Sequence, residues 1–255
     1  MLSKAKIREL RALEFKKFRD GQGLFIAEGN KLVAEMLHAF DCEWLIAHTS
    51  WMATQGDIPA KELLLAEDGD IRKISFMKTP QDVVAVFGKP SYSLDEASPE
   101  AQLVLALDGI QLPGNLGTIV RLADWFGIGH IVCSKDTADV FSPKTVQATM
   151  GALTRVKVHY ADLGDYLGKH ADSPIYGTFP DGENIYTKKL TQHGIIIMGN
   201  EGNGIRPETA SFIKDRLCIP PYPPLHETTE SLNAATATAI VCAEFRRVAA
   251  NYEIR

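Results

Sequence analysis

Two side chains that could act on a phosphate or a ribose follow a buried strand in the middle of the sequence. The apolar residues 103–107 predict the strand, and a Pro-Gly-Asn-Leu-Gly turn comes after it. Helical spacing then begins, with apolar residues at Ile119, Leu122, Ala123 and Phe126. Asn115 stands in the turn and Arg121 in the helix, six positions apart, so they share a side of the helix only loosely. An amide and a fixed cation at a strand-to-helix junction favour chemistry on a phosphate or a ribose.

A second loop rich in glycine follows an apolar strand predicted at 194–199. It reads Gly-Asn-Glu-Gly-Asn-Gly-Ile over residues 199–205 and carries one carboxylate, Glu201. Its glycines allow a ligand to approach the backbone closely. The loop is neither a Walker A motif nor a dinucleotide fingerprint, because no Lys-Ser/Thr pair follows and the GxGxxG spacing is absent. It is therefore either a ligand site or a tight turn before a helix.

A third loop combines prolines with polar residues near the end of the chain. Ile219 and Pro220 end a strand predicted at 216–219, and a helix is predicted from residue 229 or 230 to about 251, with Thr228 or Thr229 as its N-cap. Ser231 and Asn233 then fall in the first helical turn, where polar side chains and free amides can hold a ligand. Either residue could instead cap the helix.

The elements that must position these loops alternate between strand and helix. Strands are predicted at 103–108, 130–134, 174–178, 194–199 and 216–219. This alternation favours an α/β fold with a parallel sheet. Each of the three loops follows the carboxyl end of a predicted strand, which is where open α/β sheets bind ligands. Considered together, the loops predict one shared site.

The upstream part of the chain predicts a separate, smaller α/β domain over residues 1–88. A basic amphipathic helix comes first, and a segment rich in Pro, Ser and acidic residues over 89–101 has the composition of a linker. Strands are predicted at 24–27, 44–47, 62–65 and 82–87, with helices at 30–39 and near 71–73. We find no catalytic constellation in this domain.

Composition narrows the class of protein. The chain has 255 residues and a net charge of −5, but its first twenty residues carry seven basic against three acidic side chains. The basic residues Lys16, Lys17 and Arg19 either contact phosphates of a ligand or form a solvated helix face. No apolar run is long enough for a membrane span, no signal peptide is recognisable, and four scattered cysteines show no metal-ligand spacing. We therefore expect a cytoplasmic protein with neither a metal site nor a membrane partner.

The order and content of the three loops resemble the three motifs of the SpoU (TrmH-like) family of RNA ribose methyltransferases, in the SPOUT superfamily. The segment from Asn115 to Arg121, within PGNLGTIVR, is similar to the first motif, and GNEGNGI, over 199–205, to the second. Ile219-Pro220 with ESLNAA is similar to the third. The upstream domain resembles the family's L30e-like substrate-binding domain at residues 16–19, 25–29 and 79–83.

This resemblance implies a fold and a reaction. It implies a knotted methyltransferase domain over 102–255, a deep trefoil knot that works as a homodimer. The reaction is methyl transfer from S-adenosylmethionine to a ribose 2′-hydroxyl of RNA, with ribosomal RNA favoured over transfer RNA. By the same likeness, the cofactor is held by backbone atoms at Thr178, Gly199, Ile219 and Leu232.

The resemblance also assigns the catalytic residues. Arg121 either stabilises the forming alkoxide or deprotonates the hydroxyl after a phosphate perturbs it, and we favour the first role because a guanidinium is a poor base. The residues that orient Arg121, the ribose and the cofactor are Asn115, Glu201, Ser231 and Asn233. One departure is the loop over 221–229, which lacks the glycine usual in the family and could reshape the pocket.

Three alternatives stay open at this point. The substrate could be transfer RNA, or the protein could be a knotted RNA-binding protein without activity. Retention of all five polar residues argues against the second. A Rossmann dehydrogenase would need GxGxxG after its first strand and an acid about 20 residues later, and the chain has neither in frame.

Overall fold

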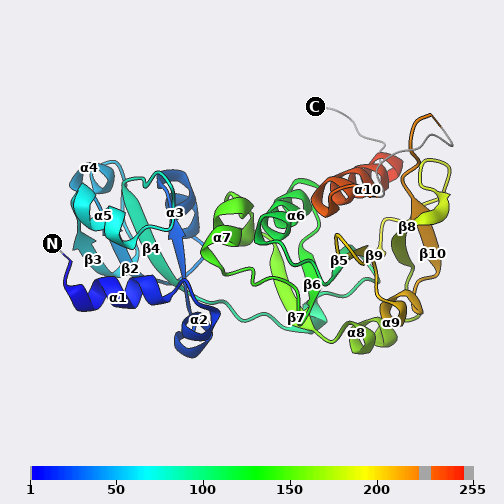
Figure 1. Ribbon diagram of the computed structural model, residues 1–255, viewed down its shortest axis with the longest axis horizontal. Helices are drawn as coiled ribbons and strands as arrows, with labels where there is room; N and C mark the ends of the chain where they lie inside the picture. The colour runs from blue at the N-terminus through cyan, green and yellow to red at the C-terminus, as the bar shows by residue number, and fades with distance from the viewer. Residues whose placement is uncertain (1, 224–230, 250–255) are drawn as a thin grey trace. The chain divides into compact units, whose positions relative to one another are not determined.

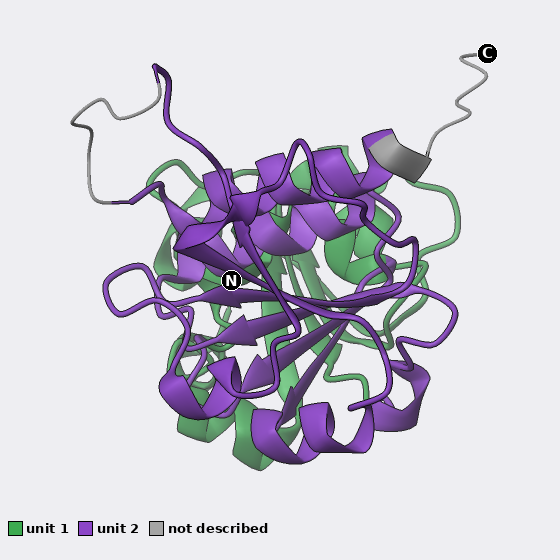
Figure 2. Ribbon diagram, turned by 90° about the vertical axis from the view of Figure 1, so that its right-hand side faces the viewer, with its two compact units in different colours: residues 1–91, 139–154 green, residues 92–138, 155–255 purple. Residues whose placement is uncertain are grey.

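The computed structural model describes residues 2–223 and 231–249, which form two compact units. Unit 1 consists of residues 1–91 and 139–154, and unit 2 of residues 92–138 and 155–255 (Figure 2). Unit 1 is therefore assembled from two separate stretches of the chain, which the sequence did not indicate. The domain boundaries drawn at 88 and 101 remain predictions, and the change from the first unit to the second falls between them.

Unit 1 is built on a four-stranded mixed sheet in the order β1-β4-β2-β3 (Figure 1). Strand β4 is antiparallel to both of its neighbours, and β2 and β3 are parallel. The central strand β4 is apolar and buried over residues 83–87, as expected for a strand covered on both faces. The strands are β1 (Leu24–Glu28), β2 (Cys42–Ala47), β3 (Ala60–Leu65) and β4 (Val83–Gly88). The helices are α1 (Lys4–Ala12), α2 (Lys16–Gln22), α3 (Asn30–Met36), α4 (Thr49–Met52), α5 (Asp68–Ile74) and α7 (Pro143–Thr149), with a 3₁₀ turn at Ala152–Thr154.

The basic N-terminal segment forms two helices, not the single helix predicted. Helix α1 ends at Ala12 and α2 begins after its N-cap residue, Phe15. The corner between them is fixed by Arg19, whose Nη1 donates to the carbonyl oxygens of Leu13 and Glu14, each at 2.7 Å. Arg19 is only 2% exposed, so the expectation that it binds phosphate is wrong. Its charge is used inside the fold.

Unit 2 contains a six-stranded sheet in the order β10-β8-β9-β5-β6-β7, and every neighbouring pair is parallel. This confirms the predicted α/β fold with a parallel sheet. The strands are β5 (Leu103–Asp108), β6 (His130–Ser134), β7 (Lys157–Ala161), β8 (Ile175–Asn184), β9 (Gly194–Gly199) and β10 (Asp215–Cys218). Strand β7 was not predicted. It lies at the sheet edge, and His159 is its one buried residue, so it lacks the apolar run of the central strands β5 and β9.

Helices cover both faces of this sheet (Figure 1). Helices α6 (Pro113–Trp125) and α10 (Ala234–Ala249) lie side by side on one face, and α8 (Leu163–Lys169) and α9 (Pro207–Ala210) lie on the other. Part of the predicted linker, a 3₁₀ turn at Leu94–Glu96, also belongs to this unit. Ala97 beside it is fully buried, and its carbonyl accepts a hydrogen bond of 2.6 Å from the Tyr166 hydroxyl.

Two helix starts differ from the predictions. Helix α6 begins at Pro113, so the Pro-Gly-Asn-Leu-Gly segment forms its first turn and does not precede it. Proline is suited to this first position because its missing N–H has no helical partner there. Helix α10 begins at Ala234, because Asn233 Oδ1 accepts from the backbone N–H groups of Ala235 (3.0 Å) and Thr236 (3.3 Å) and so caps the helix.

Ser231 and Asn233 therefore precede α10 and do not lie in its first turn as predicted. The proposed caps at Thr228 and Thr229 fall outside the described residues, as do residues 224–230 of the proline-rich loop and the predicted helix end at 251. Within the described part of the chain, no helix is long and apolar enough to cross a bilayer. The trefoil knot stays a prediction.

Candidate active site

The side chain of Asn115 connects the three loops that the sequence singled out. Its Nδ2 donates to Glu201 Oε1 at 2.6 Å, and its Oδ1 accepts from Asn233 Nδ2 at 3.1 Å. These partners are 86 and 118 positions away in the sequence. Three of the five predicted catalytic residues thus form one hydrogen-bonded cluster at the carboxyl edge of the parallel sheet.

The start of α6 favours this arrangement electrostatically. Asn115 is the third residue of the helix, where backbone N–H groups have no helical partners. The helix dipole favours negative charge at this end, so the carboxylate of Glu201 is well placed against it. Glu201 and Asn115 are both half-buried, whereas Asn233 is exposed. One side of the cluster therefore remains open to a ligand.

Arg121 lies outside this cluster. Arg121 is exposed on α6, six residues after Asn115, which corresponds to about 9 Å along the helix axis. Its side chain makes no hydrogen bond or ion pair with any other residue that the structure describes. Ser231 is exposed in the non-helical segment before α10. A guanidinium that projects into solvent is available to a substrate or to a second chain.

An ion pair between the buried carboxylate of Asp108 and the partly exposed guanidinium of Arg206 anchors the second loop, and the sequence did not single out either residue. The carboxylate of Asp108, at the end of β5, has no solvent exposure. It accepts from Arg206 N at 2.9 Å and from Arg206 Nε at 2.7 Å, and it also contacts Arg206 Nη2. The hydrogen bond to Asp108 raises the pKa of Arg206. A carboxylate directly after a buried apolar strand was the available signal, because such a group must find a partner.

Asn200 ties the second loop to the first. Its Nδ2 donates to the carbonyl of Gly109 at 2.7 Å, and its Oδ1 accepts from the N–H groups of Gly202 (2.9 Å) and Asn203 (3.0 Å). Its backbone exchanges two hydrogen bonds of 3.0 Å with Gly204. The loop over 199–205 is therefore a tight turn that presents Glu201, so the two readings of its glycines are compatible.

Two of the predicted cofactor-binding positions, Gly199 and Ile219, lie at the ends of strands β9 and β10. A Cβ on Gly199, the last residue of β9, would stand 2.3 Å from the carbonyl carbon of Gly204. The close approach of the two backbones therefore requires glycine there. Ile219 follows the last residue of β10, and Leu232, 46% exposed, precedes the cap of α10.

Thr178 lies where the pairing of β8 is interrupted. The partners of β10 on β8 jump from Gly177 to Glu183, so the peptide groups over 178–182 leave the ladder. These groups can present backbone donors and acceptors to a ligand, as a purine ring requires. With Gly199 on the neighbouring strand, the donor set fits a nucleoside held by backbone atoms.

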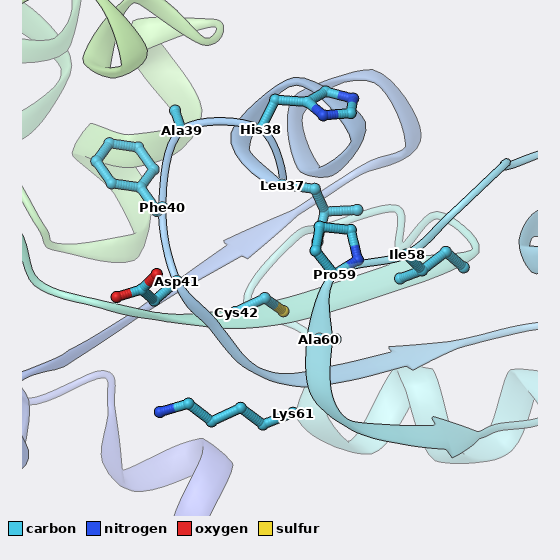
Figure 3. A pocket seen from close by; sticks show the side chains of 10 residues that line it. All are labelled: Leu37, His38, Ala39, Phe40, Asp41, Cys42, Ile58, Pro59, Ala60 and Lys61. Carbon is cyan, nitrogen blue, oxygen red and sulfur yellow. The ribbon is translucent and has the colours of Figure 1, made fainter.

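Unit 1 contains a cavity of about 440 Å³ between residues 37–42 and 58–61 (Figure 3). Its thiol, Cys42, is a poor nucleophile because burial raises its pKa to about 12. Its ammonium group, on Lys61, forms an ion pair with Glu43 at 2.6 Å.

Throughout residues 2–223 and 231–249 there is no group of three or more His, Cys, Asp or Glu side chains that could hold a metal ion.

Comparison with known proteins matches both parts of the chain. Residues 102–243 match the SpoU rRNA Methylase family, and residues 4–85 match the MRM3-like substrate binding domain. The chain is 31% identical to the 23S rRNA (guanosine(2553)-2′-O)-methyltransferase RlmP of Bacillus subtilis, over 94% of this chain and 96% of that protein.

Solved structures agree with these matches over nearly the whole chain. A TrmH-family protein from Porphyromonas gingivalis is 43% identical, with a TM-score of 0.86 over 97% of this chain and 99% of that one. An rRNA methyltransferase from Sinorhizobium meliloti with bound AdoMet is 30% identical, with a TM-score of 0.85 over 97% of this chain and 96% of that one.

Proposed function

The chain belongs to the SpoU rRNA methylase family, and from this premise we propose that it methylates a ribose 2′-hydroxyl of ribosomal RNA with S-adenosylmethionine. The structural observation that best supports this proposal is that Asn115 forms hydrogen bonds with both Glu201 and Asn233. It brings all three family motifs to one edge of the sheet. A 2′-hydroxyl exists in RNA and not in DNA, so RNA is the substrate.

The cofactor is S-adenosylmethionine, and the backbone around Thr178, Gly199, Ile219 and Leu232 is proposed to hold it. Two observations support this position. The peptide groups after Gly177 leave the ladder with β10, and the close approach of Gly199 to Gly204 leaves no space for a side chain. When bound, the cofactor supplies an electrophilic methyl group on a sulfonium.

The protein's own groups then have to position a weak nucleophile. Asn115, Glu201, Ser231 and Asn233 are proposed to orient the ribose and the methionine end of the cofactor. A guanidinium stays protonated at neutral pH, so Arg121 suits electrostatic stabilisation of the forming alkoxide and not removal of its proton. Its exposure on α6 supports this role, since it is not committed to any described partner.

We propose that the enzyme is a homodimer in which Arg121 of one chain serves the site of the other. The support is that Arg121 lies about 9 Å along α6 from Asn115. Mixing Arg121→Ala chains with Asn115→Ala chains tests this arrangement. In a shared site, one of the two sites of each mixed dimer is intact, so part of the activity returns. If mixing restores no activity, both residues act within one chain.

Labelled methyl transfer from S-adenosylmethionine to total RNA of a methylation-deficient cell tests the function. We expect label in ribosomal RNA, within a dinucleotide that resists alkaline hydrolysis because its 2′-oxygen is methylated. Label in transfer RNA would show that transfer RNA is the substrate. Label in an alkali-sensitive nucleotide would show that the methylated atom is not the 2′-oxygen. Binding of cofactor and RNA without transfer would favour the non-catalytic alternative. We place the activity in the cytoplasm, where bacterial ribosomes are assembled.

A further inference from the structure

Two phenylalanine rings at the start of α2 are exposed to solvent. Phe15 is 61% exposed and Phe18 is 46% exposed, whereas Phe25 and Phe87 of the same unit are completely buried. The two residues lie within one helical turn, and the N–H of Phe18 donates to the carbonyl of Phe15 at 3.1 Å. Unit 1 therefore buries rings elsewhere but presents two neighbouring rings at this corner.

The backbone that carries these rings is held rigidly by Arg19. This buried side chain donates to the carbonyls on the α1 side of the corner, Leu13 and Glu14, and its Nε donates to Asp139 at 3.1 Å. The rings thus project from a corner fixed by three partners. A preorganised surface loses little conformational entropy when a ligand binds.

The same surface carries positive charge. Lys16 and Lys17 stand between the two rings in the sequence, and both are exposed. Of the nearby carboxylates, Glu14 lies 3.6 Å from Arg11, and Asp20 lies 2.6 Å from Lys89 and also interacts electrostatically with Lys16. The side chain of Lys17 makes no hydrogen bond or ion pair with another residue in the described part of the chain. The field over the rings therefore favours an anionic ligand.

We propose that Phe15 and Phe18 form a stacking platform for unpaired bases of the RNA substrate, with Lys17 contacting the adjoining phosphates. This inference rests on the proposed function and extends it to the mode of substrate binding. Aromatic rings beside cations are the usual way in which proteins bind single-stranded nucleic acid. Lysine is depleted at protein–protein interfaces, so the flanking lysines favour RNA over a protein partner.

The test compares binding of single-stranded oligouridine RNA, and of an RNA duplex, by four full-length variants. Phe15→Leu/Phe18→Leu keeps apolar side chains but removes the rings, and Phe15→Trp/Phe18→Trp keeps the rings. Lys17→Gln removes one charge. Leu65→Ala is the matched control, because Leu65 is 62% exposed on β3 of the same unit and lies outside the basic segment.

We expect the leucine variant to bind oligouridine at least about fivefold more weakly for each ring, with an unchanged dependence on salt. The tryptophan variant should bind at least as tightly as the wild type, and Lys17→Gln should reduce the salt slope by about one. Duplex binding should change little for the ring variants. In methyl transfer, the leucine variant should show a raised KM for RNA and a kcat close to that of the wild type.

Several outcomes would overturn the platform. Unchanged oligouridine affinity in the leucine variant would remove the rings from RNA binding. A changed oligomeric state with unchanged RNA affinity would instead assign the surface to a protein contact. If the leucine variant lost folding free energy by as much as it lost free energy of RNA binding, the rings would have a structural role and no direct role in RNA binding. If the wild type transfers no methyl group, the proposed function fails, and the oligouridine measurements still decide the role of the rings.

Discussion

Replacing Gly199 with alanine tests the geometry of the loop that carries Glu201. An alanine Cβ at this position would stand 2.3 Å from the carbonyl carbon of Gly204 and 2.4 Å from the nitrogen of Ile205. Both atoms belong to backbone, so neither can rotate away as a flexible side chain would. Ordinary contact begins near 3.4 Å, and the loop backbone must therefore move by about 1 Å.

The other glycines of this loop provide graded controls. A Cβ on Gly202 would meet only Asn200 Oδ1, at 3.6 Å, so alanine there should cost less than about 0.5 kcal/mol. Gly204 has φ +68° but open space around it, so alanine costs about 1–2 kcal/mol of backbone strain. Overpacking at Gly199 costs about 1–3 kcal/mol and also displaces the loop. The expected order of damage is Gly199, then Gly204, then Gly202.

Calorimetric titration with S-adenosylmethionine and urea unfolding separate the two effects. We expect Gly199→Ala to weaken cofactor binding at least about tenfold, because most of the strain is relieved by moving the loop that we propose to hold the cofactor. Gly202→Ala should bind the cofactor like the wild type. The reasoning would be refuted if Gly199→Ala kept wild-type affinity and stability, or if Gly202→Ala lost as much affinity as Gly199→Ala.

Three further changes probe other parts of the molecule. Arg121→Ala should lower kcat by about 10²–10³, as loss of one alkoxide-stabilising group does, with cofactor affinity measured by titration unchanged; normal turnover would exclude the role. Arg19→Met should cost unit 1 about 3–5 kcal/mol in urea unfolding, because Asp139 would be left without its counter-charge in a largely buried position; a loss below 1 kcal/mol would contradict this. Burial raises the pKa of Glu28 despite its hydrogen bond from Ser75. Because the folded pKa is the higher one, this group favours folding at acidic pH and loses that contribution as the pH rises above about 4.5. Glu28→Gln should therefore lose less stability than the wild type between acidic and neutral pH, and parallel unfolding profiles would show that Glu28 does not titrate in this way.

The strands of the parallel sheet were predictable because burial on both faces leaves a continuous apolar run. Strand β5 is buried at every position, and β9 at all but its last. The edge strand β7 has no such run, since only His159 is buried, and its pattern does not differ from that of a loop. The other edge strand, β10, was predicted although Leu217 is its one buried residue, so an apolar run is a reliable signal only for the central strands.

The candidate site was predictable to the extent that its residues follow strands. Asn115, Glu201 and Asn233 were selected from loops after the strand ends, and the parallel sheet brings them together. The buried position of Arg19 could not be predicted, because its partner Asp139 lies 120 positions away. A local pattern does not indicate whether an arginine will pair inside the fold or face solvent.

Because unit 1 is built from two separate stretches of the chain, its folding during synthesis and its transfer by gene recombination are both constrained. Helix α7 packs on β1, where Phe141 lies 4.9 Å from Phe25 between ring centroids, and Asp139 neutralises Arg19. During synthesis, about fifty residues of unit 2 are made between the first 91 residues and the second stretch of unit 1, so unit 1 cannot complete its fold until residues 139–154 have been made. A gene fusion cut at the linker would separate a buried cation from its counter-charge. The whole chain, and not its first 91 residues, is therefore the piece that recombination can transfer intact.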